Sequence, residues 1–239
     1  MIFDPPLLPG RLIRRYKRFL ADIELDTGSI ITAHCANPGS MLGLADPGSR
    51  VWVSDSQNPK RKLRYSWELV ETADGALVGI HTSRANALVE EGLHAGALKE
   101  LQGFQTLRRE VRYGGNSRID FLLEQPDTAP IYLEVKSVTL SRTPGLAEFP
   151  DSKTARGTKH LHELAAMAAQ GARAVMVFLA QRADCHRFAI AADIDPIYEG
   201  VFNKVRQAGV EAYCYHCTIN TIDIRLEAAL PFVLSNPPA

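Results

Sequence analysis

Two stretches in the middle of the chain, RIDFLLE at residues 118–124 and YLEVKSVTL at residues 132–140, decide the fold and carry the chemistry. Both are interpreted as β-strands joined by a hairpin. Side chains two residues apart in a strand point to the same face, so Glu134 and Lys136 project side by side while Val135 faces the core. The hairpin can bring Asp120 alongside Glu134. The spacing therefore predicts two carboxylates and one amine together on one face of a sheet.

Strands and helices alternate around this hairpin from residue 83 onward. The expected elements are a helix at 84–98, strands at 106–113, 117–124 and 131–140, a helix at 154–171, strands at 172–180 and 186–191, a helix at 196–207 and a strand at 210–219. A strand that follows a crossover helix usually joins the sheet in parallel, whereas hairpin neighbours are antiparallel. This order predicts an α/β domain with a mixed central sheet.

The first third of the chain lacks any long helical pattern. Short alternating segments are expected as strands, with a strong hairpin signal at Asp74-Gly75, and they lie at 21–26, 29–33, 50–55, 64–71 and 76–81. These features predict an all-β first domain, an OB-like barrel. We expect the domains to span 1–82 and 83–239. The connection CANPGSMLGLADPGS, at 35–49, is rich in turn residues and is either a functional loop or merely irregular.

The composition is that of a folded globular protein. The 239 residues include 27 Lys and Arg against 27 Asp and Glu, with 46% hydrophobic residues, which excludes disordered and collagen-like classes. The N-terminal sequence carries no signal-peptide pattern and no apolar stretch is long enough to span a membrane, so a cytoplasmic location is expected. The four cysteines are expected to be reduced thiols.

The neutral total hides two basic clusters in the first domain. The first cluster is interleaved with Tyr16 and Phe19 and the second lies beside Tyr65 and Trp67; their members are Arg11, Arg14, Arg15, Lys17 and Arg18, and then Lys60, Arg61, Lys62 and Arg64. Basic side chains neutralise phosphates and aromatic rings stack on bases, as a single-stranded nucleic-acid groove requires. Solvated charges on strand edges explain either cluster alone equally well. Two clusters in one small domain favour nucleic acid.

The predicted carboxylate pair has a specific chemistry. Asp120 and Glu134 would supply oxygen ligands for a hard divalent cation such as Mg²⁺ or Mn²⁺. Lys136 would then reach an attacking water or a phosphate oxygen, an arrangement that favours phosphodiester hydrolysis. The alternative is an exposed Glu–Lys pair of little energetic value.

An Asp followed by Glu-x-Lys within this order of elements resembles the PD-(D/E)xK nuclease core. Beyond the core, nearly the whole chain resembles the sugar fermentation stimulation protein A (SfsA) family, in the stretches RYKRFLADIEL, HCANPGSM, NPKRKLRYSWELVE, RIDFLLE, YLEVKSVTL and FPDSKTARGTKHLHEL. The resemblance implies an N-terminal OB-like domain, a nuclease-like second domain, DNA binding with little sequence preference and a link to the regulation of sugar use, maltose in particular. Asp120, Glu134 and Lys136 match the active positions, and Ile119 replaces the proline of the superfamily's name.

The superfamily often adds a carboxylate from the helix that precedes the sheet. Glu90 or Glu91 would provide it, and Glu91 is preferred because it shares a helical face with Leu88 and Ala95. After the active strands, Lys153, Arg156 and Lys159 either contact phosphate or are exposed charges at the start of a helix. These residues complete the expected metal site and nucleic-acid surface.

Other functions are weighed against the same residues. Cys214 and Cys217 point to opposite faces if they lie on a strand, and no second Cys-x-x-C completes a zinc site, so zinc is not expected. The sequence also has no nucleotide-cofactor motif. Two hypotheses remain: a metal-dependent nuclease with a DNA-binding barrel, and a non-catalytic DNA-binding regulator of sugar metabolism. A sugar- or protein-binding first domain is a third, less favoured reading.

Overall fold

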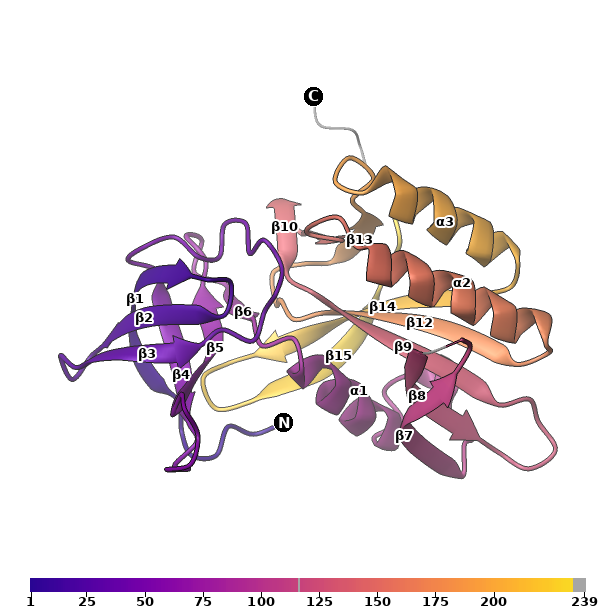
Figure 1. The fold of residues 1–239 in the computed structure, drawn as a ribbon, viewed down its shortest axis with the longest axis horizontal. Helices are drawn as coiled ribbons and strands as arrows, with labels where there is room; N and C mark the ends of the chain where they lie inside the picture. The colour runs from indigo at the N-terminus through magenta and orange to yellow at the C-terminus, as the bar shows by residue number, and fades with distance from the viewer. Residues whose placement is uncertain (116, 234–239) are drawn as a thin grey trace.

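The first domain is a β-barrel that closes on itself. The computed structural model describes residues 1–115 and 117–233, and the barrel occupies the indigo and violet part of the chain in Figure 1. Its strands run in the order β3-β2-β1-β4-β5-β6, and a parallel β3–β5 pairing between residues 33–34 and 65–66 closes five of them. The bounds are β1 Leu8–Tyr16, β2 Leu20–Leu25, β3 Ile30–His34, β4 Arg50–Asp55, β5 Tyr65–Glu71 and β6 Leu77–Gly79. The OB-like expectation is confirmed.

Alternating side chains fill the barrel. Five inward-facing side chains are fully buried in one cluster inside the barrel: Leu12, Ile23, Val51, Val53 and Trp67. Each such side chain contributes about 1.5–3 kcal/mol through burial. The stretch from Arg11 to Arg18, noted for its charge, is mostly the strand β1, because Leu12 anchors it to this core while the arginines face outward.

The second domain is built on a six-stranded mixed sheet, as expected. The strand order is β15-β14-β12-β9-β8-β7, in which β9, β12 and β14 are parallel and the outer strands are antiparallel to their neighbours. The bounds are β7 Thr106–Tyr113, β8 Ser117–Glu124, β9 Ile131–Val138, β12 Arg173–Ala180, β14 Glu211–Ile219 and β15 Ile224–Leu230. The edge strand β15 was not expected from the sequence.

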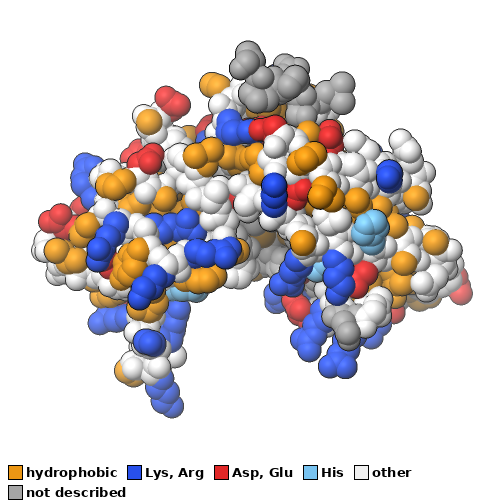
Figure 2. Space-filling model, turned by 45° about the horizontal axis from the view of Figure 1, so that its top comes forward, with side chains coloured by type: hydrophobic (Ala, Val, Ile, Leu, Met, Phe, Trp, Pro, Cys, Tyr) orange, Lys and Arg blue, Asp and Glu red, His pale blue; other side chains and the backbone are white. Residues whose placement is uncertain are grey.

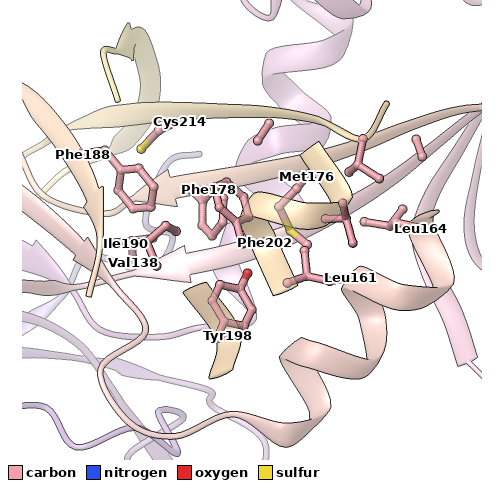
Figure 3. Close-up of a cluster of buried hydrophobic side chains, with 14 of the residues drawn as sticks. Val138, Leu161, Leu164, Met176, Phe178, Phe188, Ile190, Tyr198, Phe202 and Cys214 are labelled. Atoms are coloured by element: carbon pink, nitrogen blue, oxygen red, sulfur yellow. The ribbon is translucent and has the colours of Figure 1, made fainter. Parts of the chain in front are cut away.

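Helices cover both faces of this sheet (Figure 1). α1, Arg84–His94, packs on one face, whereas α2, Ala155–Ala169, and α3, Pro196–Gln207, pack on the other. β12 lies between them, so its even-numbered residues from 174 to 180 join the α2 and α3 cluster, and Val175, Val177 and Leu179 join the α1 cluster. Figure 3 shows Met176 and Phe178 packed among side chains from α2 and α3. None of the described helices is long and apolar enough to cross a membrane.

Two segments differ from their expected form. The helix expected at 84–98 ends at His94, and a short 3-10 turn, η1 Lys99–Leu101, follows a Gly96 with φ of 70°. The connection after β9 is not a plain loop, because β10 Leu140–Thr143 and β11 Leu146–Phe149 form a small sheet with β13, Arg187–Ile190. This second sheet holds the segment that leads into α2.

One buried ion pair ties the barrel to the start of α1. Glu68 of β5 is 1% exposed, and its carboxylate accepts hydrogen bonds from Arg84 at 2.8 and 3.1 Å and from Ser54 at 2.7 Å. Burial alone raises the pKa of Glu68, but Arg84, His81 and Ser54 together hold it below the ordinary value of 4.5. The pair fixes where α1 begins relative to the barrel.

Glu68→Ala is expected to lower the free energy of unfolding by about 2–3 kcal/mol near neutral pH, since it leaves Arg84 without its buried partner. A depressed folded pKa stabilises the protein above the unfolded pKa and loses that contribution in acid, so the deficit should shrink below about pH 4.5. Urea unfolding measures both effects. The control is Glu24→Ala, at an exposed position of β2, and equal losses in the two variants would contradict this role for Glu68.

Candidate active site

The backbone ladder between β8 and β9 gives way to a side chain at Asp120. The described pairing runs from Leu123 and Ile131 to Phe121 and Leu133. One step further, the Val135 N–H donates to Asp120 Oδ2 at 2.7 Å, and Asn86 Nδ2 of α1 donates to Asp120 Oδ1 at 2.8 Å. Both carboxylate oxygens are therefore held in place by donors from two different elements.

Glu134 occupies the neighbouring position on β9 and is almost completely covered. Its side chain is 3% exposed, and its Oε1 lies 2.6 Å from Lys136 Nζ and also contacts His160 Nδ1. Val135 is buried on the other face, as the strand period predicts. Lys136 thus lies beside Glu134 on the same face of β9, as expected from the Glu-x-Lys spacing.

His160 contacts Glu134, and the other partner of its ring defines which nitrogen carries the proton. The Arg156 Nε–H donates to His160 Nε2 at 3.4 Å, so Nε2 acts as an acceptor and the ring proton lies on Nδ1. That N–H then donates to Glu134 Oε1. The side chain of Thr154 caps α2 by accepting from the Gly157 N–H, and the Thr154 N–H donates to Asp195 at the start of α3. This anchoring fixes the position of His160 on α2.

The two carboxyl groups have opposite pKa shifts. Burial, followed by repulsion from Glu134, raises the pKa of Asp120 to about 6. Burial also acts to raise the pKa of Glu134, but His160 and Lys136 more than offset it and keep that pKa below its ordinary value. Near neutral pH both carboxyl groups are therefore ionised, and two negative charges lie close together where little water solvates them.

Among residues 1–115 and 117–233, one atom of the pair has no hydrogen-bond partner. Glu134 Oε2 is buried there and makes no hydrogen bond to them, a state that costs free energy unless another group satisfies the oxygen. A cation between Asp120 and Glu134 would satisfy it and would offset their repulsion. Oxygen-only donors suit Mg²⁺ or Mn²⁺. The residues present therefore fit such a cation, with Asp120 and Glu134 as its protein ligands.

Glu91 is not part of this site, which corrects the sequence-based expectation. Its side chain is 55% exposed and its Oε2 lies 2.6 Å from the amino terminus of Met1. Glu90 instead pairs with Arg109 at 3.3 Å. Within residues 1–115 and 117–233, no three Asp, Glu, His or Cys side chains gather closely enough to hold a metal ion. The helix contributes the amide of Asn86, so water or substrate would have to complete the coordination.

An open cleft of about 520 Å³ separates the two domains above the pair. Asn86 and Lys136, which contact the two carboxylates, lie in its lining together with Arg18 of the barrel and Lys153 and Arg156 beside α2. Figure 2 shows lysine and arginine side chains on both domains, on either side of the hollow. The cleft lining therefore carries four cationic side chains and the carboxylates of Glu148 and Asp151, while Asp120 and Glu134 lie behind the lining residues Asn86 and Lys136.

The remaining cations expected to bind nucleic acid are spread over the surface. Several are engaged within the protein: Arg11 donates to the Gly48 carbonyl, Arg14 pairs with Asp22, Arg64 pairs with Asp55, Arg61 donates to Ser66, and Lys159 donates to Ser117 and pairs with Glu163. Lys17, Lys60 and Lys62 are exposed. Arg61 lines a second pocket, between the barrel and α1, and not the main cleft.

Arg15 has a structural role that its charge did not indicate. Its guanidinium donates to the carbonyls of Arg18, Asn37, Gly39 and Ser40, at 2.8 to 3.3 Å. Arg18 donates to the Pro38 carbonyl at 2.7 Å. The two arginines therefore shape the connection after β3, whose residues Asn37, Pro38 and Gly39 line the cleft.

Comparison with known proteins matches both domains. Residues 13–80 match the SfsA N-terminal OB domain, and residues 83–222 match the sugar fermentation stimulation protein RE domain. The chain belongs to the SfsA family. It is 54% identical over 231 residues to the sugar fermentation stimulation protein homolog of Ruegeria sp. strain TM1040, covering 97% of this chain and all of the relative. The homolog of Rhodospirillum centenum is 55% identical over 230 residues, covering 96% of this chain and 98% of that one.

A solved structure supports the fold. The Pyrococcus furiosus SfsA, described in complex with Ca²⁺, superimposes with a TM-score of 0.87 at 27% sequence identity. The match covers 98% of this chain and 99% of the P. furiosus SfsA. This SfsA-family chain therefore shares both domains and their arrangement with that protein.

Asn86 and His160 complete the site of this SfsA-family protein but were missed in the sequence. His160 did carry a signal, because it lies within the buried stripe of α2 formed by Gly157, Leu161, Leu164 and Met167. A polar side chain in such a stripe needs a partner. Asn86 had no comparable signal, since its role depends on where α1 packs on the sheet.

Asp120→Asn is expected to stabilise the cation-free protein. A carboxyl group whose folded pKa is raised destabilises the fold increasingly as the pH rises from its ordinary value of 3.8 to the folded value of about 6. Removing the charge should therefore add about 2–3 kcal/mol at about pH 7.5. The gain should shrink as the pH falls and should vanish only below about pH 3.8, where Asp120 is protonated in both the folded and the unfolded protein. Urea unfolding in EDTA measures it. Asp127→Asn, in an exposed loop, is the control; a gain of equal size at both pH values would contradict the prediction.

Proposed function

We propose that the cleft binds DNA with little sequence preference, and that the protein hydrolyses phosphodiester bonds there with Mg²⁺ or Mn²⁺. The observation that carries the proposal is the buried, unpartnered Glu134 Oε2 next to Asp120. A fold keeps such an oxygen at a cost unless a ligand satisfies it. The Ca²⁺ complex of the P. furiosus SfsA adds support, because Ca²⁺ also takes oxygen ligands.

Each residue around the pair has a definite task in this proposal. Asn86 and the Val135 N–H orient Asp120, while His160 orients Glu134. Lys136 is placed to donate to a phosphate oxygen or to an attacking water, since it lies on the cleft lining. Its Nζ lies 2.6 Å from Glu134 Oε1 and 3.3 Å from His160 Nδ1. Arg18, Lys153 and Arg156 would contact the flanking phosphates.

The cation supplies charge stabilisation and a more acidic water when it is bound. The protein's own contribution is to exclude water from beneath the cleft and to hold the donors in a fixed geometry. Preorganised donors of this kind act most strongly where the dielectric constant is low, as it is around buried Glu134. The proposed hydrolysis would take place at the floor of the cleft.

A second function, DNA binding without hydrolysis, is favoured by one observation. Glu134 Oε1 is already occupied by Lys136 and His160, and the side chain is nearly inaccessible. A protein of this kind would use the cleft for binding alone and would serve as the regulator of sugar use that the relatives' names suggest. Both functions need the basic cleft walls, but only hydrolysis needs Asp120.

The decisive assay incubates the purified protein with labelled DNA in Mn²⁺, in Mg²⁺ and in EDTA. Cleavage is expected only with a divalent cation, and Asp120→Ala should slow it at least about 100-fold, as the loss of several kcal/mol of charge stabilisation predicts. Glu91→Ala is the matched control, since Glu91 binds the amino terminus, and it should cleave at the wild-type rate. Cleavage that persists in Asp120→Ala would contradict the proposed hydrolysis. DNA binding by the wild-type protein without any cleavage would favour the second function, DNA binding alone.

A further inference from the structure

We propose that the DNA taken by the cleft is single-stranded, and that Phe19 stacks on its bases at the mouth. This inference rests on the proposed function only in taking DNA as the ligand. Three observations carry it: the size of the cleft, the contact between the barrel loop and Asp151 that closes one wall of the cleft, and the exposed ring of Phe19 on the barrel.

The space at the floor of the cleft has the size of a small-ligand site. Its volume, about 520 Å³, is within the range of about 300–1,000 Å³ that holds one small ligand, and so has room for one or two nucleotides. A B-form major groove is itself about 12 Å wide, and the whole helix is wider still. Lys136 and Asn86 lie in the lining of this cleft, and a single strand, without the bulk of a paired strand, brings a phosphate to them with the least obstruction.

The barrel loop closes one wall of the cleft against the second domain. Ser40 Oγ and the Met41 N–H each lie 3.5 Å from Asp151 Oδ2, and a Cβ at Gly39 would collide with the same carboxylate. The loop is rigid here, because Arg15 and Arg18 hold its carbonyls. A duplex cannot widen the cleft at this wall without breaking those contacts. The motif Asn37-Pro38-Gly39, left open by the sequence, is thus a cleft wall.

An exposed aromatic side chain, Phe19, follows the cleft-lining residue Arg18 on the barrel. Phe19 is 44% exposed, stacks on His34 with ring centroids 6.5 Å apart, and has the Arg18 guanidinium 5.8 Å from its centroid. Arg18 itself lines the cleft, opposite Lys153 and Arg156. Phosphate-binding cations next to an exposed ring are the pattern with which proteins hold single strands. In a duplex the bases are paired inside and present no face to Phe19.

The turn between β1 and β2, which contains Phe19, has a strained backbone. Lys17 and Arg18 have φ values of 48° and 62°, in the left-handed region where residues with a Cβ lose about 1–2 kcal/mol each. The loop between the paired residues Tyr16 and Leu20 has three residues, and Gly and Asn are the residue types that most readily take a positive φ in such a loop. The chain keeps Lys-Arg here at a cost in stability, as is expected where the side chains serve a ligand.

The test measures binding by fluorescence anisotropy at low salt in EDTA, where metal-dependent cleavage cannot interfere. The probes are a short labelled single strand, its blunt duplex, and the same duplex with a single-stranded overhang. We expect the single strand and the overhang to bind at least about tenfold more tightly than the blunt duplex. Phe19→Ala should weaken single-strand binding about tenfold, as the loss of one stacked base predicts.

Two further variants separate binding from folding. Ile30→Ala removes a more exposed apolar side chain, 70% exposed against 44% for Phe19, from the far end of β3 and should leave binding unchanged. The variant Lys17→Asn relieves the turn without removing the hydrogen bond from Arg18 to the Pro38 carbonyl, so it should melt at or above the wild-type temperature and yet bind the single strand more weakly. Equal affinity for blunt duplex and single strand, or unchanged binding in Phe19→Ala, would overturn the inference.

The same measurements distinguish this inference from the proposed function. A blunt-duplex preference combined with metal-dependent, Asp120-dependent cleavage would leave hydrolysis standing and refute the single-strand inference. Single-strand selectivity without cleavage would support the single-strand inference and refute the proposed hydrolysis. Failure to bind any of the three probes would refute the inference whatever the cleavage assay gives.

Discussion

The repulsion between two buried carboxylates, Asp120 and Glu134, is the constraint on which the rest of the structure depends. Neither group would stay ionised in this place without compensation. The protein supplies it from three directions: donors to Asp120 from Val135 and Asn86, an ammonium from Lys136, and an imidazole N–H from His160. The compensation is incomplete, since Glu134 Oε2 has no hydrogen-bond partner among the described residues. Under the proposed function, a bound cation would make up this deficit.

The fold determines how closely these groups can be brought together. β9 is paired on both sides and buried, so the positions of Glu134 and Lys136 are set by the sheet. α2 returns over the sheet after β9 and places His160 and Arg156 above it. The barrel adds nothing to the carboxylates directly; through Glu68 and Arg84 it fixes α1, which carries Asn86 two residues later. It also supplies the loop that narrows the cleft.

Much of this could be predicted from the sequence, because it depends on local periodicity. The barrel strands and the mixed sheet follow from alternation, and the proximity of Asp120 to Glu134 and Lys136 follows from one hairpin. The alternation of β8 is interrupted at Asp120, because Ile119 and Phe121 join the clusters on opposite faces of the sheet. Glu91 was the wrong residue because several faces of α1 carry apolar residues, and the amino terminus, far away in sequence, pairs with it. Arg15 looked like a phosphate ligand, but its partners are carbonyls of a loop whose path no local pattern specifies. Long-range packing decided these cases.

Crystals soaked in Mn²⁺ and measured for anomalous scattering test the central claim, that the carboxylate pair is built for a divalent cation. The account predicts one strong peak within coordination distance of Asp120 and of Glu134 Oε2, about 2.0–2.2 Å from each oxygen, and no such peak in Asp120→Ala. A Glu134 Oε2 that stays unliganded at high Mn²⁺, or a peak that persists in Asp120→Ala, would contradict it.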